Sequence, residues 1–191
     1  MTAQPSWRPE PGTAEMITEN WLFRLRKERF RSRTSGVSHE FFVLHLLDAV
    51  SVVATTTDQQ VILVRQFRAG SGLDSLETPG GLVDAGEDPL AAGARELLEE
   101  TGYAGDEPRW LGTVWSNPSL MTSKFTTIQI VNARKVAEPK FDHGEEVVVE
   151  LYHLHGIPQL IENGEINHAL AILSLYSALF ANQERPERPR S

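Results

Sequence analysis

The residues best suited to chemistry are three glutamates in the middle of the chain, Glu96, Glu99 and Glu100. In a helix, residues three and four positions apart share a face, so these side chains project from one sector of the surface. Carboxylates held this close repel one another, and a hard divalent cation between them would offset the repulsion. The cluster therefore predicts a site for Mg²⁺, with Mn²⁺ as an alternative, because such ions prefer oxygen ligands.

Glutamates on a helix are more often only a solvated face, and this alternative has to be weighed against a metal site. Carboxylates in the C-terminal half of a helix oppose the helix dipole, which favours cations at that end. A bound cation would explain why they are there. Arg95 is placed to orient one carboxylate through a bidentate bond, and Gly80 and Gly81 permit a tight loop that brings a backbone carbonyl towards the same metal.

The elements that must position these residues follow from the hydropathy pattern. Asp88 and Pro89 are typical of a helix start, and Gly102 suits the left-handed position after its end. Runs of β-branched residues predict a hairpin from 49–54 and 61–67, and further strands follow at about 110–116, 124–132 and 146–153. Asn167 is expected to cap a second helix. These elements predict an α/β fold, an αβα sandwich with a mixed β-sheet.

The N-terminal segment is predicted to add an antiparallel β layer. Trp21, Phe23 and Leu25 alternate as in a strand, and the phase flips near residues 26–27, which suggests a bulge. The expected organisation is this β segment over 1–47, a central domain over 48–182 and a disordered tail over 183–191. The polar lead up to about Glu15 is also expected to be mobile. Six basic residues between Arg24 and Arg33 form either a local positive patch or a solvated strand face.

Composition excludes several functional classes. The chain of 191 residues has 18 Lys and Arg against 26 Asp and Glu, a formal net charge of −8. This net negative charge argues against binding to nucleic acid or to an anionic membrane through overall electrostatic attraction. With no cysteine there is no disulfide, thiol nucleophile or cysteine-based zinc site. No targeting segment or membrane-spanning run is expected, so the predicted location is cytoplasmic.

The spacing around the glutamates carries a family resemblance. The run from Gly81 to Tyr103 reads Gly-X5-Glu-X7-Arg-Glu-Leu-X-Glu-Glu-X-Gly-Tyr without a gap. It resembles the signature of the Nudix hydrolases, which cleave a nucleoside diphosphate linked to another moiety with the help of divalent cations. By position, the resemblance implies metal binding by Glu96, Glu100, Glu99 and the carbonyl of Gly80. It also implies a catalytic part for Glu99, and that Glu87 and Arg95 brace the loop and helix.

Two further features resemble the ADP-ribose and nucleoside diphosphate sugar pyrophosphatase branch of that family. Pro118 lies fifteen residues past Tyr103, where the branch places a proline. The run VRQFR at 64–68, followed by LETPGG at 76–81, is similar to the branch's VRQYR and LELPAG. Substrate contacts are therefore expected from Pro118, from the arginines at 65 and 68 (Arg65 and Arg68) and from Glu77.

The same resemblance implies a homodimer in which the N-terminal strands pair with those of a second subunit. Trp21 is then a candidate to stack on the nucleotide base, against the alternative that it only packs in the sheet. The general base is expected in the acidic loop 142–149, first Glu145 and then Glu146, with His143 as an alternative.

The predicted function is Mg²⁺-dependent hydrolysis of the pyrophosphate bond of an ADP-ribose-like nucleoside diphosphate sugar, to a nucleoside monophosphate and a sugar phosphate. Departures from the branch in LETPGG and in SNPSLMTSK at 116–124 leave other nucleotide sugars open. Two alternatives also stay open. One is a pyrophosphohydrolase of (deoxy)nucleoside triphosphates or dinucleoside polyphosphates, and the other is a non-catalytic module that senses nucleotide sugars.

Overall fold

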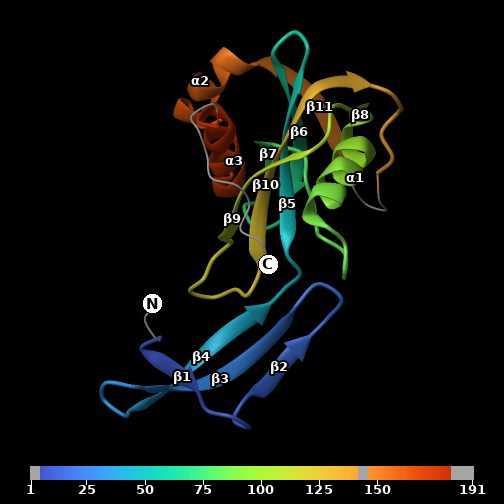
Figure 1. Cartoon of the computed structure of the whole chain (residues 1–191). Helices are drawn as coiled ribbons and strands as arrows, with labels where there is room; N and C mark the ends of the chain where they lie inside the picture. Colours follow the sequence, from blue (N-terminus) through green and yellow to red (C-terminus); the bar gives the residue numbers. More distant parts are fainter. Residues whose placement is uncertain (1–4, 142–145, 182–191) are drawn as a thin grey trace. The chain divides into compact units, whose positions relative to one another are not determined.

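The structure is a computed structural model that describes residues 5–141 and 146–181 (Figure 1). The chain divides into two compact units. Unit 1 comprises residues 1–47 and 115–124, and unit 2 comprises residues 48–114 and 125–191. The segment around Pro118 thus belongs with the N-terminal strands, while the tail expected at 183–191 lies outside the described residues.

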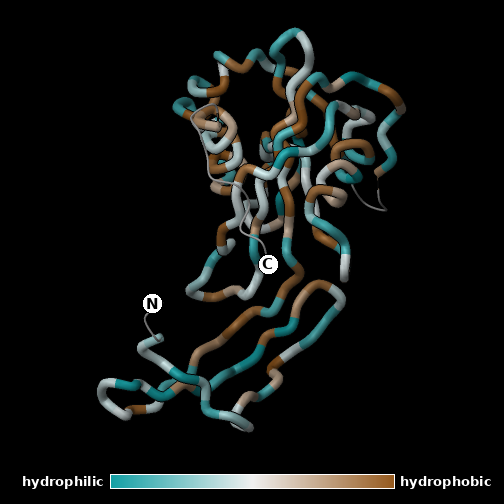
Figure 2. Tube along the Cα trace, viewed as in Figure 1, coloured by the Kyte–Doolittle hydropathy of each residue, from teal (hydrophilic) through white to brown (hydrophobic). Residues whose placement is uncertain are grey.

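Unit 1 is built on a four-stranded antiparallel sheet of β1 (Trp7–Pro9), β2 (Glu15–Glu19), β3 (Arg24–Ser32) and β4 (Ser38–His45). β4 pairs with β3 along most of its length, whereas β1 and β2 share the other edge of β3. Figure 2 shows the hydrophobic residues of β4 beside the mostly polar β3. Residues 115–124 join this unit because the Leu44 backbone N–H donates to Leu120 and its carbonyl accepts from Thr122.

The two faces of this sheet differ in character. Residues directly opposite each other on paired strands share a face, so Phe30 lies beside His39 and Glu28 beside Phe41. Trp7, Phe30, His39 and Phe41 form an edge-to-face aromatic cluster. The other face carries three ion pairs, Lys27–Glu15, Arg29–Glu40 and Arg31–Glu10. Arg26 also lies 4.0 Å from Glu28, on the face of the aromatic cluster, so four of the six basic residues between 24 and 33 are paired with glutamates of their own unit.

Three sequence-based expectations for the N-terminal segment are wrong. The lead up to about Glu15, expected to be mobile, contains strand β1 and ends where β2 begins, and the strand expected from Trp21 begins only at Arg24. The reason is a turn in which the Asn20 side chain accepts from the backbone N–H groups of Leu22 and Phe23. The register irregularity falls between Met16 and Thr18 of β2 rather than at 26–27.

Unit 2 holds a seven-stranded mixed sheet with helices on both faces (Figure 1). Its strands are β5 (Ala49–Thr56), β6 (Gln60–Arg68), β7 (Leu73–Glu77), β8 (Tyr103–Ala104), β9 (Arg109–Trp115), β10 (Lys124–Lys135) and β11 (Val147–His153). β10 runs parallel to β5, whereas β5–β6, β6–β7 and β6–β11 are antiparallel. The hairpin and the three later strands expected from the sequence are confirmed.

Two hydrophobic cores separate the sheet from its helices. The first packs α1 (Pro89–Thr101) on one face through Ala92 and Leu97. The second packs α2 (Ile157–Glu162) and α3 (Ala169–Leu179) on the other, with a short 3₁₀ turn at Leu154–Gly156 before α2. This αβα arrangement confirms the predicted fold class. Over the described part of the chain, no helix combines the length and the hydropathy needed to cross a membrane.

The ends of the two principal helices show how local sequence sets their bounds. The Asp88 side chain accepts from the Leu90 N–H, Pro89 occupies the first turn, and Gly102 has a φ of 73°, as expected. α3 begins one residue later than predicted. Its cap is His168, whose Nδ1 accepts from the Ala171 N–H, and not Asn167.

Candidate active site

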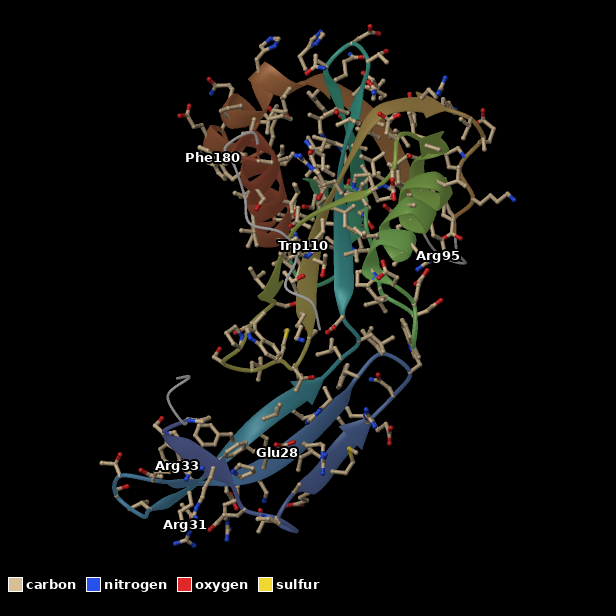
Figure 3. All side chains as sticks on the ribbon, in the orientation of Figure 1. Glu28, Arg31, Arg33, Arg95, Trp110 and Phe180 are labelled. Atoms are coloured by element: carbon tan, nitrogen blue, oxygen red, sulfur yellow. The ribbon has the colours of Figure 1, made fainter. Side chains whose placement is uncertain are left out.

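The carboxylates of α1 are organised by one arginine, Arg95, which is labelled on α1 in Figure 3. Its guanidinium donates to both oxygens of Glu87, at 3.0 and 3.1 Å, and through Nη1 to Glu96 at 2.8 Å and Glu99 at 3.0 Å. Nη2 also reaches the Leu82 carbonyl at 3.2 Å. Arg95 therefore ties the loop before α1 to two of the three glutamates. The bidentate bond expected to one of those three goes instead to Glu87, whereas Glu96 and Glu99 each accept a single bond.

Charge pairing shifts the pKa values of Arg95 and of its partner Glu87. Its hydrogen bonds, together with one from the Asp84 N–H, hold the pKa of the Glu87 carboxyl below its ordinary value. The same contacts, led by the bond to Glu87, raise the pKa of Arg95. Glu87 is thus a carboxylate and Arg95 a cation at any physiological pH. The positive charge offsets the repulsion that three clustered glutamates would otherwise suffer.

The loop glycines are in direct contact with the other carboxylates of the cluster. The Gly80 N–H donates to Glu100 Oε2 at 2.9 Å, and Glu100 is only 6% exposed. A Cβ added to Gly81 would lie 2.4 Å from Glu96 Oε1, whereas one added to Gly80 would lie 2.2 Å from the Val50 carbonyl oxygen. Only glycine fits either position without displacing a neighbour. The loop therefore packs closely against Glu96 at Gly81 and against the Val50 backbone at Gly80.

The donor set fits a hard divalent cation. It consists of carboxylate oxygens on adjacent turns of α1, and the space beside Gly81 is filled by the Glu96 carboxylate. Within residues 5–141 and 146–181, no three acidic or histidine side chains already converge on a common point. Arg95 Nη1 bridges Glu96 and Glu99, so binding of a cation would require these two carboxylates to turn partly away from it.

Arg68 and Glu77 form a second charged pair beside the same loop. Arg68 Nε and Nη2 donate to the two oxygens of Glu77, at 2.9 and 2.8 Å. Burial alone raises the pKa of the Glu77 carboxyl, but the bonds and charge of Arg68 outweigh burial, so the net pKa is lowered. Both residues line a cavity of about 350 Å³ in unit 2 that also reaches Gly80 and Gly81. The structure thus brings these two predicted substrate contacts near the metal-binding candidates.

Arg65 is held in a different cluster. Its guanidinium donates to both oxygens of Glu150 on β11, at 2.5 and 3.3 Å, and the Tyr152 hydroxyl donates to Glu150 as well. The bond from Arg65 lowers the pKa of Glu150, and the bond to Glu150 raises the pKa of Tyr152. Arg65 does not line the cavity that contains Arg68. Its predicted contact with substrate stays a prediction.

The remaining predicted residues are spread over the chain. Glu146 is exposed just before β11, while Glu145 and His143 lie outside the described residues. Trp21 is 90% exposed in unit 1, beside a cavity of about 260 Å³ lined by residues 19–24 and 45–47. Pro118 is exposed in the loop between β9 and β10, and this loop hydrogen bonds to Leu44 of β4. The structure does not bring Trp21 or Pro118 together with the carboxylates within one unit.

Three polar residues of the cavity in unit 2 were missed from the sequence. His168 lies 3.8 Å from Glu77, measured from Nδ1 to Oε2, and the hydroxyls of Ser51 and Thr78 hydrogen bond to each other at 2.6 Å. His168 precedes an apolar helical run, the position of a helix cap, and this was the available signal. Nothing local marks Ser51 or Thr78, since their proximity depends on how β5 and the loop after β7 pack.

An αβα sandwich whose first helix carries this glutamate cluster beside a glycine loop defines a Nudix hydrolase. Residues 45–172 match the family model of the NUDIX domain. The chain therefore belongs to the Nudix family, and it is an enzyme of that family. Nudix hydrolases generally use divalent metal ions.

Among its relatives are two curated pyrophosphatases. An ADP-sugar pyrophosphatase of Mus musculus is 43% identical over 148 residues, which are 68% of this chain and 67% of that protein. An ADP-ribose pyrophosphatase of Mycobacterium tuberculosis is 28% identical over 162 residues, 84% of this chain and 78% of that protein. The crystal structure of an ADP compounds hydrolase has a TM-score of 0.79 and 22% identity and covers 94% of this chain and 97% of its own. That likeness supports the fold.

Proposed function

We propose that the protein hydrolyses the pyrophosphate bond of a nucleoside diphosphate sugar that resembles ADP-ribose, and releases a nucleoside monophosphate and a sugar phosphate. The observation that carries this proposal is the contact of Gly80 and Gly81 with Glu100 and Glu96, which gathers oxygen donors of the Nudix helix beside a cavity. The names of the mouse and mycobacterial relatives support the substrate class.

The proposed cofactor is Mg²⁺, with Mn²⁺ as the alternative, held by Glu96, Glu100, Glu99 and the Gly80 carbonyl. When bound, such a cation polarises the phosphoryl oxygens and lowers the pKa of a coordinated water. The positive charge matters because a diphosphate carries negative charge that repels an attacking water.

The chain's own residues have distinct tasks in this proposal. The Gly80 N–H fixes Glu100, and Arg95 orients Glu96 and Glu99. Arg68 offers its guanidinium to the diphosphate. A carboxylate of the acidic segment that precedes β11 in the sequence, Glu145 or Glu146, accepts the proton of the attacking water. The water oxygen bonds to one phosphorus, the bond from that phosphorus to the bridging oxygen breaks, and the other phosphate leaves with the bridging oxygen.

The proposal includes a cytoplasmic homodimer formed through the N-terminal strands. The aromatic cluster on one face of the unit 1 sheet supports it, since Trp7 and Phe41 are each more than one third exposed. A partly exposed aromatic cluster of this kind is typical of a subunit interface. Trp21 and Pro118 are the residues of unit 1 proposed to contact substrate in that assembly.

The test is hydrolysis by the purified protein with Mg²⁺ of a panel that contains ADP-ribose, ADP-glucose, GDP-mannose, a deoxynucleoside triphosphate and a dinucleoside polyphosphate. We expect phosphomonoesters from the nucleotide sugars and loss of activity with EDTA. Glu100→Gln is expected to lower kcat by about 100-fold or more. It removes a charged ligand of the cation that stabilises the negative charge on the diphosphate.

Glu138→Gln is the matched control, since this glutamate is exposed and pairs with Lys135 outside the site. It should retain the activity of the unaltered protein. Release of pyrophosphate from the triphosphate, with no product from the nucleotide sugars, would contradict the proposed substrate class. An unimpaired Glu100→Gln variant would contradict the proposed metal site.

A further inference from the structure

The cavity beside the glycine loop has features that the proposed hydrolysis does not use. It measures about 350 Å³ and is formed by unit 2 alone. Gly80 and Gly81 separate it from the carboxylates of α1, because they line the cavity and also contact Glu100 and Glu96. A substrate whose diphosphate lies at those carboxylates would therefore have one of its two end groups at the mouth of this cavity.

The polar groups in the cavity are fixed before any ligand arrives. Glu77 is 3% exposed, and its two oxygens accept hydrogen bonds from Nε and Nη2 of Arg68. Neither side chain therefore has much freedom to turn. Its pKa is lowered even though burial opposes this, and it is therefore an acceptor. A carboxylate oxygen can accept more than one hydrogen bond, so Glu77 retains capacity for ligand hydroxyls.

His168 supplies a donor of defined tautomer. Its Nδ1 accepts from the Ala171 N–H at 3.4 Å and caps α3, so the neutral ring carries its proton on Nε2. The same ring lines the cavity and lies 3.8 Å from Glu77. The helix cap thus leaves Nε2–H as the donor of a ring that lines the cavity, while Nδ1 is the nitrogen that lies 3.8 Å from the buried Glu77 carboxylate.

The walls around these groups are apolar. Leu82, Phe125 and Leu170 line the cavity together with Ala49 and Ala171. A sugar ring presents hydroxyls at its edge and C–H groups on its faces, and this combination fits an acceptor, two donors and apolar walls. The carboxylate disfavours a phosphate at depth. A volume of about 350 Å³ is at the small end for ligand sites and suits one ring better than a whole nucleotide.

We propose that this cavity binds the sugar that lies beyond the diphosphate, and that His168 is a residue that determines which sugar is accepted. Glu77 acts with it by accepting sugar hydroxyls, and Arg68 positions Glu77. This inference rests on the proposed function for its substrate, but the cavity can also be tested by itself.

The kinetic test compares the unaltered protein with His168→Asn. Asparagine is a favoured helix cap, so this variant keeps the cap of α3 while it removes the imidazole donor. Substrates vary either in the sugar (ADP-ribose, ADP-glucose, ADP-mannose) or in the base (ADP-ribose, GDP-ribose). We expect KM for the preferred sugar to rise about three- to tenfold, as for one lost hydrogen bond. The kcat should stay within about twofold and the base preference should not change.

His155→Asn is the matched control, because His155 is exposed on the 3₁₀ turn and does not line the cavity. It should match the unaltered protein, and thermal melts should show that both variants fold. Unchanged ratios of kcat/KM among the sugars would overturn the proposal. If the base preference changes instead, the cavity binds the nucleotide base and not the sugar, and this result also overturns the proposal.

A binding experiment separates this inference from the proposed function. Ribose 5-phosphate is titrated into the protein without metal, and amide shifts are followed by NMR. We expect shifts at Thr78 and Ala171, and a dissociation constant raised at least about threefold in His168→Asn. If no nucleotide sugar is hydrolysed, the proposed function fails while these shifts would still support the sugar site. If the shifts are absent in the unaltered protein, the sugar site fails whatever the enzyme hydrolyses.

Discussion

Glu77 shows at the scale of a residue how a buried charge is tolerated. Removing a carboxylate from water is costly unless it is paired and hydrogen-bonded. Arg68 meets this need with two donors, and its own side chain is 42% exposed, so the cation keeps part of its hydration. The pair can therefore remain charged beside an apolar cavity and be available to a ligand.

The lowered pKa of Glu77 predicts a pH dependence of stability. Its folded pKa lies below the unfolded value of about 4.3, so the stabilisation is complete above that value and is lost as the pH falls through the folded pKa. Glu77→Gln should lower the free energy of unfolding by about 1–3 kcal/mol near neutral pH, because it leaves Arg68 without its charged partner. The difference should shrink below about pH 4.

Urea denaturation of both proteins across this pH range measures the effect. Glu162→Gln, at an exposed position on α2, serves as the control and should change stability by less than about 0.5 kcal/mol. A difference between unaltered protein and Glu77→Gln that stays constant down to acid pH would refute the assignment of a charged, stabilising Glu77.

At the scale of an element, α1 is held in place at both of its ends. Asp88 caps its start, and the Gly102 N–H donates to the Leu98 carbonyl at its end. A Cβ on Gly102 would lie 2.0 Å from the Ala137 carbonyl oxygen, so the end of the helix is fixed against the following segment. Since Glu96, Glu99 and Glu100 lie on this helix, its position sets theirs.

Loss of the cap should reduce stability more than it alters chemistry. Asp88→Ala removes the acceptor for the Leu90 N–H and should cost about 1 kcal/mol in the free energy of unfolding. Asp88→Ser keeps a capping oxygen and should stay close to the unaltered protein. Urea denaturation monitored by circular dichroism compares the three, and equal stability of the alanine and serine variants would show that the cap contributes nothing.

At the scale of the whole molecule, unit 1 has a partly exposed aromatic cluster that its own strands do not cover. The aromatic cluster of Trp7, Phe30, His39 and Phe41 lies on one face, and the opposite face is laced with ion pairs. A partly exposed aromatic cluster on a sheet is expected to be buried against a partner. A second copy of the chain is the partner we propose.

Phe41→Arg should therefore convert a dimer into a monomer. Sedimentation velocity at micromolar concentration should give twice the 21.3 kDa of the chain for the unaltered protein and about 21.3 kDa for the variant. Val37→Arg is the control, since Val37 is exposed in the turn between β3 and β4, outside the cluster. A monomeric unaltered protein, or a Phe41→Arg variant that remains dimeric and folded, would contradict the homodimer.

Much of this architecture could be predicted because it is specified locally. Asp88, Pro89 and Gly102 mark the ends of α1 by backbone chemistry that needs no distant partner, and the β-branched runs mark the central strands. The N-terminal strands were harder. The Asn20 turn delays β3, and β1 and β2 are exposed strands stabilised by pairing with β3, which no local periodicity reveals.

The spacing of Glu96, Glu99 and Glu100 within one helix determined the acidic cluster, since helical geometry converts sequence separation directly into proximity. Tertiary structure alone decided that Arg65 pairs with Glu150 and that His168 lies beside Glu77. These pairs join elements far apart in the chain. Which of them meet depends on strand register and on helix packing, and only the folded sheet fixes both.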